Sequence, residues 1–345
     1  MNVQITDKTE RKDMYSSIYA NKIPALLNEL ANTPEMQRLS DIGMHCGCEY
    51  ANFPIYREER FRYTRLLHSI GVANIVWNFT QDLKQAVAGL LHDISTPTFA
   101  HTIDFLNNDH ITQESTEEKT LLFIKNSKSI TTLLEKYDIN VDDVGDYSKY
   151  PIADNDTPML SADRLEYTLG NAYIINNMDL NEIQDIYNDL IVVKNENGIE
   201  ELCFKSLQYA KKFVEVSLQN SYWFVSDEDR FSMQYLADTI KEAIQNNVLT
   251  FDDLFTTEKH VIQKLKDNYR TYEIWDRYTK ISSVSAMDKK DPNIYCVNIP
   301  AKKRYINPLV LIGNNIKRVS DVDEISKKNI EKFLSLDFNK WIYAV

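Results

Sequence analysis

The chain has 345 residues, more than the roughly 250–300 at which one hydrophobic core stops growing, so we expect one large core with a smaller appended lobe. Its formal net charge of −12 argues against strong nucleic-acid binding, which needs a basic face, but allows a small anionic substrate. No basic-then-apolar leader opens the chain and no apolar run approaches the roughly 18 residues of a membrane span, so we expect a cytoplasmic protein without membrane contact.

The first part of the chain has the hydrophobic spacing of helices. Residues 23–42 carry apolar side chains at helical spacing, and Thr33-Pro34 predicts a fresh helix start within that stretch. The pattern predicts further helices and stays helical from 179 to 247. These further helices are expected at 66–79, 83–92, 116–123 and 159–178.

The residue pattern of the sequence changes after about Tyr272. Short β-branched runs follow, broken by Pro, Asn and Gly as strands usually are: ISSVSA, IYCVNIP and INPLVLIG. We therefore expect a mainly α protein, with a helical domain at 1–268 and a small α+β C-terminal lobe at 269–345.

Five of the six histidines fall between residues 45 and 110. A single histidine is more often a satisfied surface or core residue than a ligand, but this clustering favours a functional site. His92-Asp93 ends the apolar helix AVAGLLHD, so its imidazole and carboxylate are expected at the floor of a cleft.

Two more residues complete a candidate metal site. His68 lies in TRLLHSIGV, one predicted helix earlier, and Asp163 begins DRLEY on a later helix. With His92 and Asp93 they form a mixed nitrogen and oxygen set, which suits one divalent transition metal among Mn, Fe, Co, Ni and Zn. Such a metal lowers the pKa of bound water and polarises a phosphoryl oxygen, and Mg²⁺ accompanying the phosphate is a further cofactor expectation.

Three segments, TRLLHSIGV, LLHDISTPTFAHTID and SADRLEYTLGNAY, resemble the motifs of the HD-domain dNTP triphosphohydrolases in order and spacing. This family comprises bacterial enzymes and their sterile-alpha-motif-linked animal relatives. NTPEMQRL and KKRYINPLV extend the resemblance to about residues 23–310. The resemblance implies an HD-domain helical core, a nucleotide as the small phosphorylated ligand, and a homo-oligomer.

The resemblance also implies roles for single residues. Arg65 and Arg164 match residues that contact substrate phosphates, and Tyr167 matches a tyrosine that contacts the nucleotide. His45 falls in the segment that lines the nucleotide pocket. The family's four metal ligands match His68, His92, Asp93 and Asp163.

The chain departs from the family pattern at catalytic positions. Thr96 stands where the family has a histidine three residues after the Asp of the HD pair, and Thr116 aligns with a second catalytic histidine. Gly170-Asn171 replaces Arg-Asp. The candidate metal ligands therefore match the family pattern better than the residues expected to transfer protons do.

His101, Asp104 and His110 are the remaining candidates for catalysis. His101 and Asp104 keep their places in the motif, although a histidine there can equally orient a ligand or pack a helix. His110 could supply a proton or a further metal ligand, and its alternative is an ordinary surface-loop residue.

Three functions remain open at this stage. The first is a metal-dependent phosphohydrolase acting on a nucleotide or related phosphate ester, with Arg65, Arg164 and the AKKR segment at 301–304 binding phosphate. The second is an HD-type diiron oxygenase, in which His101 and His110 hold a second metal. The third is a nucleotide-binding homologue without hydrolysis, suggested by the two threonines.

Overall fold

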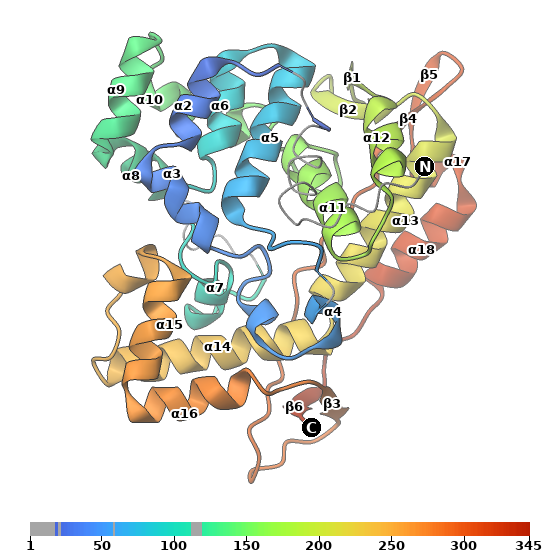
Figure 1. The fold of residues 1–345 in the computed structure, drawn as a ribbon. Helices are drawn as coiled ribbons and strands as arrows, with labels where there is room; N and C mark the ends of the chain where they lie inside the picture. Colours follow the sequence, from blue (N-terminus) through green and yellow to red (C-terminus); the bar gives the residue numbers. More distant parts are fainter. Residues whose placement is uncertain (1–17, 20–21, 58, 112–118) are drawn as a thin grey trace, which may run out of the picture.

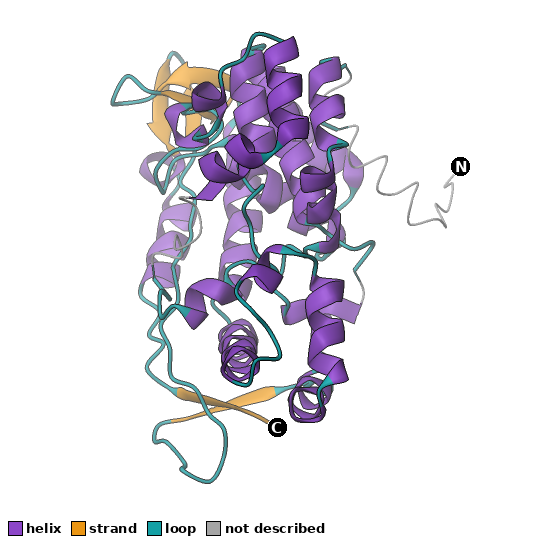
Figure 2. Cartoon of the chain, turned by 90° about the vertical axis from the view of Figure 1, so that its left-hand side faces the viewer, coloured by secondary structure: helices purple, strands orange, loops and turns teal. Residues whose placement is uncertain are grey.

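The computed structural model describes residues 18–19, 22–57, 59–111 and 119–345. Over these residues the protein is mainly α-helical with two small β-sheets, which confirms the predicted fold class. The two groups of strands lie near opposite ends of the molecule, with helices between them (Figures 1 and 2).

The N-terminal helices form a packed layer around α5 (Arg65–Thr80) and α6 (Leu83–Leu91). The two helices approach closely at Gly89, where an added Cβ would lie 3.3 Å from Val72 Cγ1. The predicted fresh helix start is confirmed, because α3 begins at Pro34 with Thr33 as its N-cap. The remaining elements of this part are α2 (Ala25–Ala31), α3 (Pro34–Arg38), η1 (Leu39–Asp41), η2 (Cys48–Tyr50), α4 (Pro54–Arg57), α7 (Thr102–Leu106), α8 (Thr120–Asn126), α9 (Lys128–Lys136), α10 (Val141–Val144) and η4 (Tyr147–Lys149).

The later helices form two groups. In the first, α11 (Ala162–Ile174) packs against α5 and against α13 (Leu207–Phe224), beside α12 (Leu180–Asn188). In the second, α14 (Asp227–Gln245) packs on α7 and carries α15 and α16 at its far end (Figure 1). The other elements are η5 (Asp252–Phe255), α15 (Glu258–Asp267), α16 (Tyr269–Tyr278), α17 (Val319–Val322) and α18 (Glu324–Leu334).

The four-stranded sheet has the order β1-β2-β4-β5, and its first two strands correct a prediction. The segment 179–247 was expected to be helical throughout, but β1 (Leu190–Lys194) and β2 (Glu200–Phe204) form an antiparallel hairpin within it. The turn is closed by Asn195, whose Oδ1 accepts the N–H groups of Asn197 and Ile199, and by Gly198 at φ +76°. The β-branched run before an Asn- and Gly-containing turn is the hairpin signal that the helical interpretation overlooked.

The strands after residue 268 divide between two sheets. β4 (Leu309–Ile312) pairs in parallel with β2 and antiparallel with β5 (Asn315–Arg318), whereas β3 (Val284–Met287) pairs antiparallel with β6 (Trp341–Ala344). IYCVNIP contributes only an isolated bridge, from Val297 to Ile342. The segments before and after residue 268 thus contribute strands to the same sheet. The division into two domains at that residue stays a prediction.

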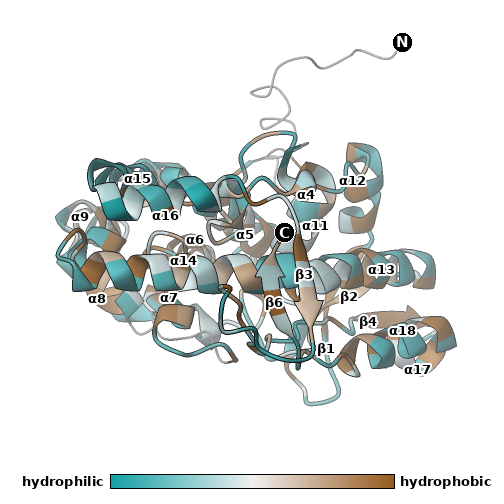
Figure 3. Cartoon of the chain, turned by 90° about the horizontal axis from the view of Figure 1, so that it is seen from below, coloured by the Kyte–Doolittle hydropathy of each residue, from teal (hydrophilic) through white to brown (hydrophobic). Residues whose placement is uncertain are grey.

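The hydrophobic core also has two main parts. The larger includes buried residues of α2, α5, α6, α11 and α13, and the smaller surrounds α14, α15 and α16. On α15 and α16 the buried residues include Val261, Leu265, Trp275 and Tyr278, and Figure 3 shows hydrophilic stretches on both helices. Among the described residues, no helix is both long and apolar enough to cross a membrane.

Candidate metal centre and its cavity

His68 lies in the first turn of α5, which Thr64 begins by accepting the Leu67 N–H on its side chain. Arg65 lies three residues before His68, and side chains at this spacing project from the same face of a helix. Both side chains are buried. The first turn of α5 therefore places the guanidinium of Arg65 and the imidazole of His68 on the same buried face of the helix.

His92 is the C-cap of α6, and Asp93 opens the turn that follows. The Arg38 guanidinium fixes this turn, donating to the carbonyls of Ile94 and Thr96 and, on the other side, to that of Thr256. The arginine of the NTPEMQRL motif thus positions the His-Asp pair without entering the site.

Asp163 comes from the first turn of α11, where Ser161 is the N-cap. Its Oδ1 lies 3.0 Å from Nε2 of His68 and 3.7 Å from Nε2 of His92. The ligand atoms of these three residues all lie within 4.8 Å of one another. Three helices from distant parts of the sequence therefore converge on one point.

Asp93 lies beside this cluster. Its Oδ2 is 3.5 Å from Nε2 of His92 and accepts from Arg65 at 3.0 Å, while its Oδ1 accepts from the Thr96 hydroxyl at 2.8 Å. Thr96, which stands where the resemblance predicts a histidine, therefore orients the carboxylate. Asp93 is near enough to serve as the fourth ligand, and that role stays a prediction.

The far nitrogen of each imidazole also has a partner. Nδ1 of His68 lies 2.5 Å from Oε2 of Glu166, which also accepts from the Tyr63 hydroxyl, and Nδ1 of His92 lies 2.7 Å from the Gly89 carbonyl. A carbonyl oxygen can only accept, so His92 donates from Nδ1. Each Nε2 is thereby turned toward the cluster, the arrangement that metal-binding histidines usually have.

Glu166 was not predicted from the sequence. It lies three residues after Asp163 on α11 and is completely buried. Residues at this spacing share a helix face, so the glutamate of DRLEY could have been identified as a partner of the ligand set.

The electrostatics of the site suit a cation. Burial alone would lower the pKa of His68, but its hydrogen bonds to Asp163 and Glu166 outweigh burial and raise the pKa to about 10. Burial would raise the pKa of Asp93, yet Arg65 and the two histidines hold it well below its usual range. A divalent ion could take the place of the proton on His68, because metal binding to such a site releases protons. The donor set therefore fits the predicted divalent metal.

The cluster opens into a cavity of about 420 Å³, a size typical of small-ligand sites. Cationic groups line it from three parts of the chain, because Lys302 and Arg304 join Arg65 and Arg164 there. Lys303, between the first two, instead donates to the carbonyls of Leu334 and Leu336. The AKKR segment thus contributes two side chains to the cavity wall.

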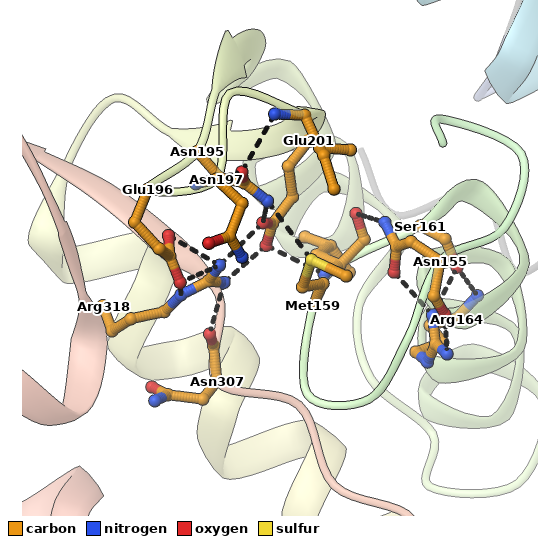
Figure 4. A network of polar contacts seen from close by, with 12 residues as sticks. Asn155, Met159, Ser161, Arg164, Asn195, Glu196, Asn197, Glu201, Asn307 and Arg318 are labelled. Atoms are coloured by element: carbon orange, nitrogen blue, oxygen red, sulfur yellow. Dashed lines mark hydrogen bonds and ion pairs between the residues drawn. The ribbon is translucent and has the colours of Figure 1, made fainter. Parts of the chain in front are cut away.

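Arg164 is already engaged within the protein (Figure 4). It donates to the side chains of Asn155 and Ser161 and lies 3.4 Å from an Asp154 oxygen. It therefore braces the loop that lines the cavity before α11, and its predicted phosphate contact stays a prediction.

The same loop is held from the opposite side. The Leu160 N–H donates to Glu201 on β2, and Glu201 pairs with Arg318 at the end of β5 (Figure 4). The four-stranded sheet therefore fixes the position of the segment from which α11 begins.

The structure separates the predicted catalytic residues. His101 lines the cavity, and its Nδ1 lies 2.9 Å from Oδ2 of the buried Asp104. His110 packs against Phe105, with Nε2 3.0 Å from Oε1 of Gln234, and is not part of the described cavity wall. Thr116 lies outside the described residues.

Tyr167 and His45 both line the cavity, and their contacts with a nucleotide stay predictions. His45 is buried against Trp223 at a ring-centroid distance of 4.9 Å. Burial, together with the nearby Arg65, lowers the pKa of His45 to about 3, so this ring is neutral near pH 7.

Several cavity residues had no sequence signal. Tyr147 stacks on His92 at 4.9 Å with an interplanar angle of 29°. Asp154, Trp223 and Asp229 also line the cavity. None of them belongs to a segment that sequence spacing connects to the histidines.

No protein-family model matches the chain. The uncharacterized protein YdhJ of Bacillus subtilis is 27% identical over 308 residues, covering 89% of this chain and 90% of that protein. The metal-dependent phosphohydrolase cns2 of Cordyceps militaris is 28% identical over 165 residues, 48% of this chain and 46% of that protein. The solved structure of a phosphohydrolase from Bacteroides thetaiotaomicron shares the fold, with a TM-score of 0.63 at 17% identity, covering 94% and 96% of the two chains.

The similarity to cns2 supports the phosphohydrolase part of the predicted resemblance, and the solved structure supports the fold. The part that concerns dNTP triphosphohydrolases stays a prediction.

Proposed function

We propose that this protein is a metal-dependent phosphohydrolase that acts on a nucleotide or a related phosphate ester. The observation that carries the proposal is the convergence of His68, His92 and Asp163 at a cavity that cationic side chains also line. The similarity to cns2 supports the same reaction class. The predicted homo-oligomer and cytoplasmic location stay expectations.

The metal ligands would be His68, His92, Asp163 and Asp93. A bound divalent ion supplies a Lewis acid and lowers the pKa of a water molecule. The protein's contribution is to hold both imidazoles with Nδ1 protonated and Nε2 facing the ion, through Glu166 and the Gly89 carbonyl.

The phosphate would be bound by cationic groups on two sides of the cavity. Arg65 is fixed beside the ligands by Asp93, while Lys302 and Arg304 come from the extended C-terminal segment. Guanidinium groups bind phosphate oxygens through paired hydrogen bonds, so Arg65 and Arg304 suit this role better than a lysine would.

His101 is the residue best placed to move a proton. Asp104 accepts from its Nδ1, which leaves Nε2 as the nitrogen that can exchange a proton with a ligand. Burial lowers the pKa of His101, an effect that Asp104 opposes only in part, so the ring is a neutral base near pH 7. It can accept a proton from the attacking water, and Asp104 then stabilises the charged ring.

The finer substrate assignment follows from the two threonines. A dNTP hydrolysed to nucleoside and triphosphate needs a proton on its leaving oxygen, and general acid catalysis is worth about 10²–10⁴-fold. We therefore expect slow dNTP hydrolysis here and faster hydrolysis of esters whose leaving group needs no proton.

The test combines elemental analysis of the full chain with a substrate panel. The panel contains the dNTPs, the NTPs and p-nitrophenyl phosphate, each assayed with Mn²⁺, Fe²⁺, Co²⁺, Ni²⁺, Zn²⁺ and Mg²⁺. We expect chelator-sensitive hydrolysis, with p-nitrophenyl phosphate faster than the dNTPs. Full metal occupancy with tight nucleotide binding and no turnover would instead identify a non-hydrolytic binding protein.

The same measurements address the diiron alternative. Two irons per chain and absorption in the visible range would favour it. Within the described residues, however, His68, His92 and Asp163 form the one group suited to a metal, and neither His101 nor His110 belongs to it.

A further inference from the structure

One buried carboxylate joins two loops of the cavity wall from behind. Glu258 is the first residue of α15, and its side chain is fully buried without being part of the described cavity wall. Its Oε1 accepts the Gly43 N–H at 3.0 Å and the Phe99 N–H at 3.4 Å. Its Oε2 accepts from the Tyr50 hydroxyl at 2.7 Å and from the Arg62 guanidinium at 2.8 Å. Four donors therefore hold this side chain in one position.

A second buried carboxyl shows where the negative charge of this region lies. Neither oxygen of Glu49 has a hydrogen-bond partner within the described residues, and burial together with the charge of Glu258 raises the pKa of Glu49 to about 8. Burial raises the pKa of Glu258 too, although Tyr50 and Arg62 oppose this effect. Near pH 7 Glu49 is therefore neutral, and the charge stays on Glu258, which has the donors.

Each backbone group that Glu258 binds lies two residues before a histidine of the cavity wall. The loop that begins at Gly43 leads to His45, and the loop that begins at Phe99 leads to His101. Glu258 therefore connects α15 to both histidines through the backbone.

The loop before His101 has an unusual backbone. Phe99 and Ala100 have φ angles of +60° and +44°, in the left-handed region that residues other than glycine rarely adopt. Such residues persist only where surrounding contacts hold them in place. The hydrogen bond from the Phe99 N–H to Glu258 is one of these contacts. Its loss would let the loop relax, and His101 would move with it.

The Gly43 loop is held from another side as well. The Met44 N–H donates to the Tyr63 carbonyl at 3.1 Å, next to the start of α5. This loop should therefore keep its shape when Glu258 is changed, and the effect of such a change should fall mainly on His101.

We propose, building on the proposed function, that Glu258 is a positioning residue, which holds the strained Phe99–Ala100 turn and so keeps His101 oriented as a base. Asp104 fixes the ring of His101 through Nδ1, whereas Glu258 fixes the backbone from which that ring extends. Glu258 makes no contact with the substrate in this role.

The first test needs no turnover. NMR titration of the Zn²⁺-loaded, full-length protein with ring-labelled histidines follows the protonation of His101, and His101→Gln assigns its signal. Burial lowers the pKa of His101, Arg304 and Arg65 lower it further, and Asp104 opposes them. In Glu258→Ala the relaxed loop should let solvent reach the ring, so the pKa should rise toward the ordinary histidine value of about 6.5.

The second test asks whether Glu258 acts through His101. With p-nitrophenyl phosphate as substrate, Glu258→Ala should lower kcat about 10²-fold, the cost of a misplaced catalytic group, with KM and metal content little changed. In a His101→Ala background the same change should have almost no further effect, because the group that Glu258 positions is already absent.

Two further variants separate positioning from stability. Thr257→Ala is the matched control, because the Thr257 hydroxyl caps α15 by accepting the His260 N–H and bonds to neither loop. It should lower the melting temperature and leave kcat and the pKa of His101 unchanged. Glu258→Gln keeps one acceptor oxygen for the two N–H groups but loses the charge, so it should show smaller changes than Glu258→Ala in the same direction.

An unchanged His101 pKa in a folded Glu258→Ala or Glu258→Gln protein would overturn the proposal. An equal loss of kcat with and without His101→Ala would also overturn it, since Glu258 would then act on the fold in general. In both cases chelator-sensitive hydrolysis by the wild type would still support the proposed function. A wild-type protein that hydrolyses no phosphate ester would refute the proposed function itself, and with it the role of His101 as a base.

Discussion

The two sides of the cavity are built in different ways. The metal side comes from α5, α6 and α11, which pack in one core, and each imidazole has a second partner on its far nitrogen. The substrate side comes from the α13–α14 corner and from residues 302–305, which belong to no helix or strand. A rigid side suits a metal that needs fixed geometry, and a side made from connecting segments can vary with the substrate.

The largest expected effect lies on the metal side. Asp93→Ala should abolish stoichiometric metal binding and reduce hydrolysis by at least about 10³-fold, because the metal supplies several kcal/mol of transition-state stabilisation. The melting temperature should fall as well, since the metal binds only the folded state. Elemental analysis, steady-state rates and thermal scans measure these changes.

Asp143→Ala is the matched control, because Asp143 is an exposed carboxylate that pairs with Lys84 on the surface. It should leave metal content and rate unchanged. Stoichiometric metal in the Asp93→Ala protein would show that Asp93 is not a ligand.

The next largest effects are expected from residues that hydrogen-bond to the proposed ligands. Glu166→Gln should weaken metal affinity about 10–100-fold, as expected when the outer partner of a metal-binding histidine is lost. Tyr63→Phe, which removes only the hydroxyl that donates to Glu166, should have a smaller effect. Competition with a chelator of known affinity measures both. If Glu166→Gln binds metal as tightly as the wild type, His68 is not held through Glu166.

The two sides also differ in how far the sequence predicts them. His68, His92, Asp93 and Asp163 could be identified because each ends or begins a helix with a clear apolar pattern. Glu166 could have been found by helical spacing from Asp163.

Trp223 and Asp229 could not be found in this way. They reach the cavity because α13 packs on α11 and α14 packs on α7, and no local pattern specifies those contacts. The β1–β2 hairpin was missed for a different reason, since its short strands lie between strongly helical segments. Local periodicity predicted most of the helices, and the sequence motifs identified the candidate metal ligands, while the substrate side depends on tertiary packing.

On the substrate side we expect a smaller effect, confined to binding. Arg304→Ala should raise KM for a phosphorylated substrate by about tenfold, the value of one charge-assisted hydrogen bond, with metal content unchanged. Lys303→Ala is the control, because its ammonium group bonds to carbonyls of Leu334 and Leu336 outside the cavity. Equal KM values for the two variants would show that Arg304 does not bind the substrate.

The smallest expected effect concerns Asp253, which lies in η5, the element that hydrogen-bonds to the segment after His92-Asp93. The Thr98 N–H in that region donates to the Leu254 carbonyl of η5, and Asp253 accepts from Thr250 and Lys264. Burial would raise the pKa of Asp253, but the hydrogen bond from Lys264 and those from Thr250 and His260 lower it overall. A lowered pKa in the folded state means that Asp253 stabilises the protein above its unfolded pKa, and that this contribution is lost as the pH falls through the folded pKa.

Asp253→Asn should therefore reduce the free energy of unfolding by about 1–2 kcal/mol at pH 7, and the difference from wild type should shrink below about pH 4. Urea denaturation at several pH values measures it. Asp252→Asn, at an exposed neighbouring position, should change little. A difference that does not depend on pH would show that the charge of Asp253 is not the cause.

The order of these parts along the chain has a consequence for biosynthesis. The predicted ligands and Glu166 all lie between His68 and Glu166, whereas Lys302 and Arg304 come much later. Because domains form as the chain emerges from the ribosome, N-terminal part first, the proposed metal ligands are made well before Lys302 and Arg304. A nascent chain, or one cleaved before residue 302, would carry every proposed metal ligand but lack the two cationic side chains that the C-terminal segment adds to the cavity wall.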